Sequence, residues 1–226
     1  MYKRQPWVSF EALLDYCWAH GIAVLHVSNF PKNIKRMHGL SARVGGRPVI
    51  VLSWAKRHPA WLLFVLAHEL GHLALGHVPD ESTLVDEAVD QASQDDEEKQ
   101  ANAFALEALN GSASTRFAAA DRWPRASGLA AEASRIAKEK QIDPGHVVLN
   151  YANTMGKNFF AVANAALALL DGLDDASELV RRRLAKHLDW ERLPADSSEF
   201  VMRMTKMRHA SADPPVPVQA GESRVD

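Results

Sequence analysis

The ten residues 68–77, HELGHLALGH, carry three histidines and a glutamate in one short stretch. His68 and His72 are four residues apart, so on a helix they lie on one face, one turn from each other. Two imidazoles at that spacing can bind one zinc ion through bonds of about 2.0 to 2.1 Å. Glu69 is rotated by roughly 100° from His68, which suits a base acting on water rather than a third ligand. The pattern therefore predicts metal-assisted hydrolysis.

The alternative is a group of histidines that only forms hydrogen bonds. The residues that precede the motif, Pro59 to Ala67, are strongly apolar, which predicts a buried helix. Buried polar side chains without partners carry a desolvation cost, and a metal ion would offset it. Gly71 lies inside this helix, where glycine costs stability relative to alanine. We therefore favour a metal site and expect another element to approach closely at Gly71.

A catalytic zinc ion needs a third protein ligand and an open position. The candidates are His77, Asp86, Glu87, Asp90, the acidic run 95–98 and Cys17. On a continuous helix His77 would point roughly 140° away from His72, so we expect it at the helix C-terminus or in contact with a ligand. Cys17 is interpreted as a small buried apolar residue.

A second helix is predicted to begin near Asp95 or Asp96 and to end at Gly111. One face of this helix begins with Glu98. The other residues of this stripe are small or apolar, except for one asparagine. The stripe continues through Ala101, Asn102, Ala105 and Leu109. Small side chains would let the helix approach the histidines, so that Glu98 could point at the metal. The alternative for Glu98 is one more solvated carboxylate of the acidic run.

Two neighbours of Glu98 have predicted positions of their own. Asn102, one turn further on, could accept a hydrogen bond from the free ring nitrogen of a histidine ligand and fix its tautomer. Glu97 is rotated away from the stripe and should face solvent.

The elements before the motif predict a small, mostly antiparallel sheet. A first helix spans residues 9–21, with Ser9 as its N-cap, and a strand follows at residues 22–27. Residues 40–53 read as a hairpin that turns at Gly45-Gly46. The long helix should begin near His58-Pro59 and be stopped by Pro79.

The remainder of the chain is predicted to be helical. Residues 79–98 are acidic and indicate a solvated connector over most of their length. Four further helices are expected within 129–141, 144–156, 158–172 and 176–188. We divide the chain into a metallopeptidase domain at 1–155, C-terminal helices packed on it at 156–208, and a disordered tail at 209–226.

Composition limits the class of protein. The 226 residues are 47% apolar and 24% charged, which suits a globular core. The formal net charge of −2 argues against a general nucleic-acid or membrane-surface binder. Cys17 is the single cysteine, so no internal disulfide forms. Glu11 and Asp15 interrupt any signal-peptide core, and the apolar run is too short for a membrane span. We expect a soluble cytoplasmic protein.

The two motif segments together resemble those of the ImmA/IrrE-type metallopeptidases. That family pairs a His-Glu-x-x-His helix with a downstream helix of the pattern Glu-x-x-Ala-Asn-x-Phe-Ala, and here the second segment reads EEKQANAFALEAL. The resemblance covers about residues 8–155. It implies that His68, His72 and Glu98 bind one catalytic zinc ion and that Glu69 is the catalytic glutamate. This chain ends its second motif helix in EALNG, where LLMP is frequent in the family.

The resemblance also implies a fold and a substrate class. The fold would be α+β, with the small sheet packed on a mainly helical, zincin-like (gluzincin-like) domain. The activity would be that of a zinc endopeptidase that cleaves a DNA-binding repressor, typically of the Xre type and encoded nearby, which controls stress or phage-response genes. No direct nucleic-acid binding and no membrane association are expected. His146 and Tyr151 are candidates for contacts to the oxyanion or substrate, with packing as the alternative.

Two other classes of function remain alternatives. Residues 136–152 have the spacing of a helix-turn-helix with a turn near Ile142-Asp143. The second helix of that unit, however, offers few side chains for base edges and no arginine, so two packed helices are favoured. The other alternative is a regulator with a zinc fold that binds a partner without cutting it.

Overall fold

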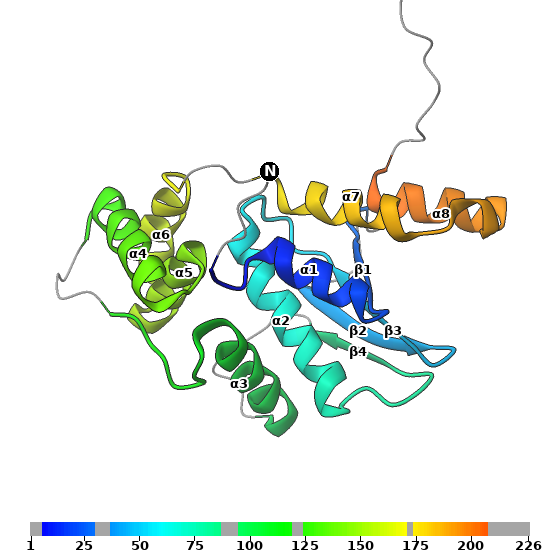
Figure 1. Cartoon of the computed structure of the whole chain (residues 1–226), viewed down its shortest axis with the longest axis horizontal. Coiled ribbons are helices and arrows are strands. Elements are labelled where there is room, and N and C mark those ends of the chain that lie inside the picture. The colour runs from blue at the N-terminus through cyan, green and yellow to red at the C-terminus, as the bar shows by residue number, and fades with distance from the viewer. Residues whose placement is uncertain (1–5, 30–36, 87–94, 119–123, 171–173, 208–226) are drawn as a thin grey trace, which may run out of the picture.

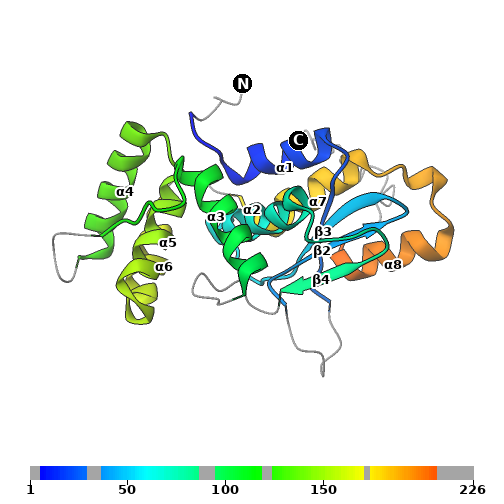
Figure 2. The same ribbon diagram turned by 90° about the horizontal axis from the view of Figure 1, so that it is seen from below.

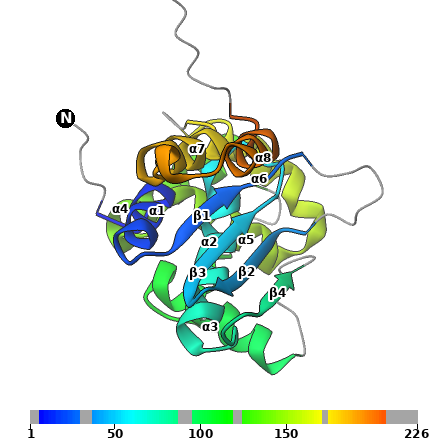
Figure 3. The same ribbon diagram turned by 90° about the vertical axis from the view of Figure 1, so that its right-hand side faces the viewer.

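The structure is a computed structural model that describes residues 6–29, 37–86, 95–118, 124–170 and 174–207. Its architecture is α+β, as predicted (Figure 1). A four-stranded sheet is formed by β1 (Ala23–His26), β2 (Gly39–Val44), β3 (Arg47–Leu52) and β4 (Thr83–Asp86). The strand order is β1-β3-β2-β4, and the sheet lies against the long helix α2 (Pro59–Leu75), as Figure 3 shows.

The sheet is mixed but mostly antiparallel, which confirms the prediction. β2 pairs antiparallel with both β3 and β4, and only β1 and β3 run parallel. The β2–β3 hairpin turns at Gly45 and Gly46, whose φ angles of 57° and 73° belong to the left-handed region. A two-residue hairpin turn with positive φ at both positions matches the twist of the strands, and glycine adopts it without a steric penalty.

The prediction of a connector over most of residues 79–98 is wrong for its first part. Residues 83–86 form β4, which pairs with β2 in the register Leu40↔Val85. The sequence reads TLVD there, and two apolar residues within an acidic stretch are too short a signal to indicate a strand. Pairing with β2, which is remote in sequence, stabilises the strand instead.

Helix α2 begins where it was expected and ends earlier than expected. His58 is the N-cap, and its side chain accepts a hydrogen bond from the backbone N–H of Ala60. Gly76, with φ of 79°, is the C-cap, so the prediction that Pro79 stops the helix is wrong by three residues. Glycine in the left-handed conformation is a common end of a helix. His77 therefore lies outside the helix.

Two further helices flank α2. α1 (Phe10–Ala19) is capped by the hydroxyl of Ser9, as predicted, but it ends at Ala19, with His20 as its C-cap, before the expected Gly21. α3 (Asp96–Asn110) has both predicted ends, the carboxylate of Asp95 and Gly111. α3 crosses α2 closely at Gly71, where an added Cβ would lie 3.2 Å from the Cα and the carbonyl oxygen of Ala101. The small-residue stripe of α3 is buried against α2, as expected.

Two hydrophobic cores meet at α2. The first core combines α1, the sheet, most of α2, α3 and α7 (Ala176–His187). The second combines α4 (Ala126–Lys140), α5 (Pro144–Met155) and α6 (Phe160–Leu167), and it includes Ala60 from the first turn of α2. Figures 1 and 2 show α4, α5 and α6 grouped at one end of the molecule. The division at residue 155 stays a prediction, and side chains from both sides of that position share the second core.

The C-terminal part adds one helix that the sequence did not single out, α8 (Ala195–Thr205). Short 3-10 turns lie at Lys157–Phe159 and Trp190–Arg192. The predicted disordered tail, residues 209–226, lies outside the described residues. Within the described ranges, no helix combines the length and apolar character that crossing a bilayer requires.

Candidate metal centre

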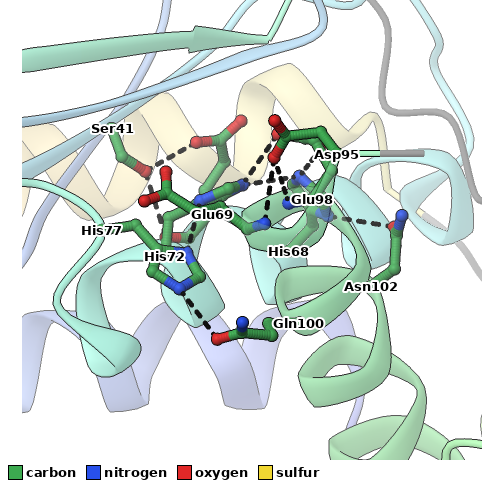
Figure 4. Close-up of polar contacts among 10 residues, drawn as sticks. Ser41, His68, Glu69, His72, His77, Asp95, Glu98, Gln100 and Asn102 are labelled. Carbon is green, nitrogen blue, oxygen red and sulfur yellow. Dashed lines mark hydrogen bonds and ion pairs between the residues drawn. The ribbon is translucent and has the colours of Figure 1, made fainter. Parts of the chain in front are cut away.

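Two histidines of α2 and one carboxylate of α3 converge on one point. His68 and His72 are fully buried, and their Nε2 atoms lie 3.0 Å apart. The carboxylate of Glu98 lies 3.4 Å from Nε2 of His68 and 3.3 Å from Nε2 of His72. Figure 4 shows the three side chains pointing toward one another from the two helices. All three offer a ligand atom within 4.8 Å of the others, which is close enough to bind one metal ion.

The spacing and chemistry of these groups fit an ion of the size of zinc. Four ligands around zinc at about 2.0 to 2.1 Å occupy the corners of a tetrahedron with edges of about 3.3 to 3.4 Å. The distances between the carboxylate of Glu98 and the two histidines match that edge, and the Nε2–Nε2 distance is slightly shorter. Two imidazoles and one carboxylate leave a fourth corner open, as catalytic zinc sites do.

The local sequence of α3 explains why Glu98 reaches the histidines. Asp95 accepts hydrogen bonds from the backbone N–H groups of Glu97 and Glu98, at 2.9 and 3.1 Å, and so fixes the first turn of the helix. Ala101 then packs against Gly71, which brings the two helix axes together. Glu97, one position earlier, is exposed, as predicted. The cap at Asp95 and the close contact between Ala101 and Gly71 therefore place the side chain of Glu98 next to the histidines of α2.

The second ring nitrogen of each histidine also has a partner. Nδ1 of His68 lies 3.1 Å from Oδ1 of Asn102, inside the protein. Nδ1 of His72 lies 3.0 Å from Nδ1 of His77. His77 was expected at the helix C-terminus or in contact with a ligand, and it lies directly after the C-cap Gly76 and contacts His72. The angle of roughly 140° does not apply, because the chain leaves the helix at Gly76. His77 folds back beside His72, so it contacts one of the converging histidines.

The carboxylate of Glu69 is held by strand β2. The side chain is fully buried, and its Oε2 accepts a hydrogen bond of 2.6 Å from the hydroxyl of Ser41. The carboxylate also packs over Gly39, where an added Cβ would overlap Oε1 and lie 2.6 Å from Cδ. Sequence reasoning missed Gly39 and Ser41. They alternate along the strand and so share a face, but nothing in the sequence shows that this face meets Glu69.

The other candidates for a third ligand do not join this cluster. Among the described residues, only His68, His72 and Glu98 bring ligand atoms together in this way. Cys17 is buried in the first core, and burial raises the pKa of its thiol to about 12, so it remains a neutral thiol, as expected. Asp86 ends β4, and Glu87 and Asp90 lie outside the described residues.

His146 and Tyr151 are placed in the buried helix α5. The ring of His146 stacks on Phe64 with 6.2 Å between ring centroids, and the ring of Tyr151 meets Phe159 edge-on at 5.9 Å. Neither side chain has a hydrogen-bond partner among the described residues. Phe64 is itself a neighbour of His68, at 6.4 Å between ring centroids. Contact of either residue with a substrate is an untested prediction.

A separate hollow of about 1060 Å³ lies at the other end of α2, between α1, α4, α5 and α7. Its wall includes Phe10, His58 and Lys138, and none of the converging metal-site side chains. His58 precedes His68 by ten residues, which is about 15 Å along a helix. The hollow is therefore not the surface that surrounds the metal site.

A His-Glu-x-x-His helix facing a carboxylate on a second helix is the residue set of a metallopeptidase. Comparison with protein families agrees, because residues 17–122 match a peptidase family whose model is described as the IrrE N-terminal-like domain. This match supports an ImmA/IrrE-type assignment for residues 17–122, and the matched segment contains His68, Glu69, His72 and Glu98. No curated protein and no solved structure matched the chain.

Proposed function

We propose that this protein is a zinc-dependent endopeptidase that cleaves a helix-turn-helix regulator of the Xre type, or a similar regulatory partner. The observation that carries the proposal is the convergence, within 4.8 Å, of His68 and His72 of α2 with Glu98 of α3, while α2 also carries Glu69. The family match supports a peptidase. The Xre-type substrate, encoded nearby and linked to stress or phage response, rests on the resemblance of the motifs alone.

In this proposal His68, His72 and Glu98 hold the metal, with Asn102 and His77 keeping the two rings in place. Zinc, when bound, lowers the pKa of a water molecule and polarises the scissile carbonyl group. Glu69 takes the proton from the attacking water and passes it to the leaving amine. Ser41 and Gly39 hold the carboxylate of Glu69 at the edge of the site, so that little reorganisation is needed.

The proposal extends to the fold and the location. A sheet packed on the helix that carries the motif supports assignment to the zincin-like folds. The single, buried cysteine supports a cytoplasmic protein, since disulfides are rare in that compartment.

The first test is coexpression with the regulator encoded next to this chain, comparing wild type with Glu69→Gln. The glutamine keeps the shape of the side chain but cannot take a proton, so we expect the cleavage product to vanish while bound zinc stays at one per chain. Glu97→Gln is the matched control. Glu97 is exposed on α3, so this variant should cleave the regulator as the wild type does. Cleavage by Glu69→Gln at the wild-type rate would rule out the mechanism.

The structure offers little support to a DNA-reading role for α4 and α5. Every residue from 145 to 152, the middle of the would-be reading helix, is buried. A recognition helix must present side chains to the major groove. A gel-shift series at increasing salt with purified protein tests this alternative. Sequence-specific retardation of DNA at physiological salt would support it.

A further inference from the structure

The hydrogen-bond chain behind His72 continues past His77. Nε2 of His77 lies 3.3 Å from Oε1 of Gln100, an exposed residue of α3. Together with the 3.0 Å contact between the Nδ1 atoms of His77 and His72, this gives a chain of three side chains. Figure 4 shows the chain approaching His72 from the side opposite to Glu98.

The hydrogen bonds that link His72, His77 and Gln100 can run in only one donor-to-acceptor direction if His72 is to bind a metal. The amide oxygen of Gln100 only accepts, so Nε2 of His77 carries the hydrogen. Nδ1 of a neutral His77 then holds a lone pair and accepts a hydrogen bond from Nδ1–H of His72. Nε2 of His72 is left with its lone pair, directed toward Nε2 of His68 and the carboxylate of Glu98. The opposite direction would place a hydrogen on Nε2 of His72, where it would block a metal bond.

The backbone holds His77 in this position. Gly76 turns the chain with φ of 79°, and the N–H of His77 then donates to the carbonyl oxygen of His72 at 3.0 Å. This is the six-to-one hydrogen bond of a helix that ends in a left-handed glycine. His77 is thus tied to His72 by a backbone bond as well as through its ring.

We infer that Gln100 is a positioning residue, which acts through His77 to hold His72 in the tautomer and orientation that bind a metal. The inference rests on the proposed metal function and deepens it. Helix α3 then serves both histidines, since Asn102 contacts His68 directly while Gln100 reaches His72 through His77. The same helix supplies Glu98.

The test is the zinc affinity of the purified full chain, measured by competition with a chromophoric chelator. Loss of a residue that orients a metal ligand costs about 10- to 100-fold in affinity. We expect His77→Ala to lose about tenfold and Gln100→Leu, at an exposed position, about threefold. Gln100→Glu keeps an acceptor for His77 and should bind as wild type does. Glu97→Ala is the control for a change on the same turn of α3.

Nuclear magnetic resonance of ¹⁵N-labelled histidine gives an independent readout. In the zinc-loaded protein, Nδ1 of His72 should carry the hydrogen, and Gln100→Leu should broaden or shift that signal. Equal zinc affinity in wild type and Gln100→Leu would overturn the inference while leaving the metal site intact, whatever His77→Ala does. A wild-type chain that takes up no zinc would instead overturn the proposed function, and this inference with it. Gln100 is exposed, so its variant separates positioning from folding even if His77→Ala is unstable.

Discussion

At the scale of single residues, the carboxylate of Glu69 is the most closely fitted group of the site. It is buried between Ser41, which donates a hydrogen bond, and Gly39, whose missing side chain makes room for it. A buried carboxylate needs such donors, because an unpaired charge away from water is costly. The proposed base is therefore held by a strand, whereas the proposed metal ligands converge from α2 and α3.

Gly39→Ala tests this fit. The added methyl group would overlap Oε1 of Glu69, so the carboxylate must shift. A displacement of about 1 Å at a catalytic group can cost about 100-fold in rate. We expect cleavage of the regulator to fall by 10- to 100-fold while zinc affinity stays near that of wild type. Gly128→Ala is the matched control, since nothing lies within 4 Å of its added methyl group. Unchanged cleavage by Gly39→Ala would contradict the proposed position of the base.

The residues of the motif could be predicted from sequence because helical periodicity is local. His68, Glu69 and His72 have fixed relative angles on any helix, and the stripe from Glu98 to Leu109 is another helical repeat. Ser41 and Gln100 could not be predicted. Their partners are 28 and 23 residues away in sequence, and the contacts depend on how a strand and a helix end are placed in space.

At the scale of elements, α5 buries two polar side chains, His146 and Tyr151, that have no hydrogen-bond partner among the described residues. His146 is 2% exposed, and both of its ring nitrogens lack hydrogen bonds there. Burial lowers the pKa of His146 to about 4, because the charged imidazolium would lose its hydration. The helix thus holds a neutral histidine against Phe64 of α2.

This burial predicts a pH dependence of stability. In the unfolded chain His146 takes up a proton near pH 6.5, whereas in the folded protein it does so only near pH 4. Stability contributed by the neutral ring is complete above pH 6.5 and falls as the pH drops toward 4, by about 3 kcal/mol at most. His146→Phe should show a shallower decline between pH 7 and pH 5 in urea unfolding of the metal-free protein. An unchanged pH slope would contradict the prediction.

Elements were predictable from sequence to different degrees. α1, α3 and the β2–β3 hairpin carry their own caps and turn residues, such as Ser9, Asp95 and Gly45-Gly46. β4 has no such signal in its sequence, and it is stabilised by antiparallel pairing with the edge of β2. The early end of α2 was missed because both Gly76 and Pro79 are helix terminators, and the sequence alone does not rank them.

At the scale of the whole molecule, the candidate metal joins segments that are distant in the chain. His72 and Glu98 belong to α2 and α3, with β4 between them in sequence. A ligand that binds only the folded state stabilises it in proportion to RT ln(1 + [L]/Kd), about 2.7 kcal/mol at 100 times Kd. The centre should therefore contribute to folding as well as to chemistry.

Removal of metal tests this contribution. We expect a chelator to lower the free energy of unfolding by a few kcal/mol, measured as a shift of the urea midpoint. Glu98→Ala should show no such response, because one ligand is gone, while Glu97→Ala should respond as wild type does. A chelator effect of equal size in Glu98→Ala and wild type would show that metal stabilises the protein at another place.

The close crossing at Gly71 has a consequence for which ions the centre accepts. The backbones of α2 and α3 approach closely at Gly71 and Ala101, which limits the space between Glu98 and the two histidines, the proposed ligands. Ions with longer bonds need more space, so we expect them to bind less tightly there. We therefore expect Gly71, which supplies no ligand atom, to influence the size of the ion that the proposed centre accepts.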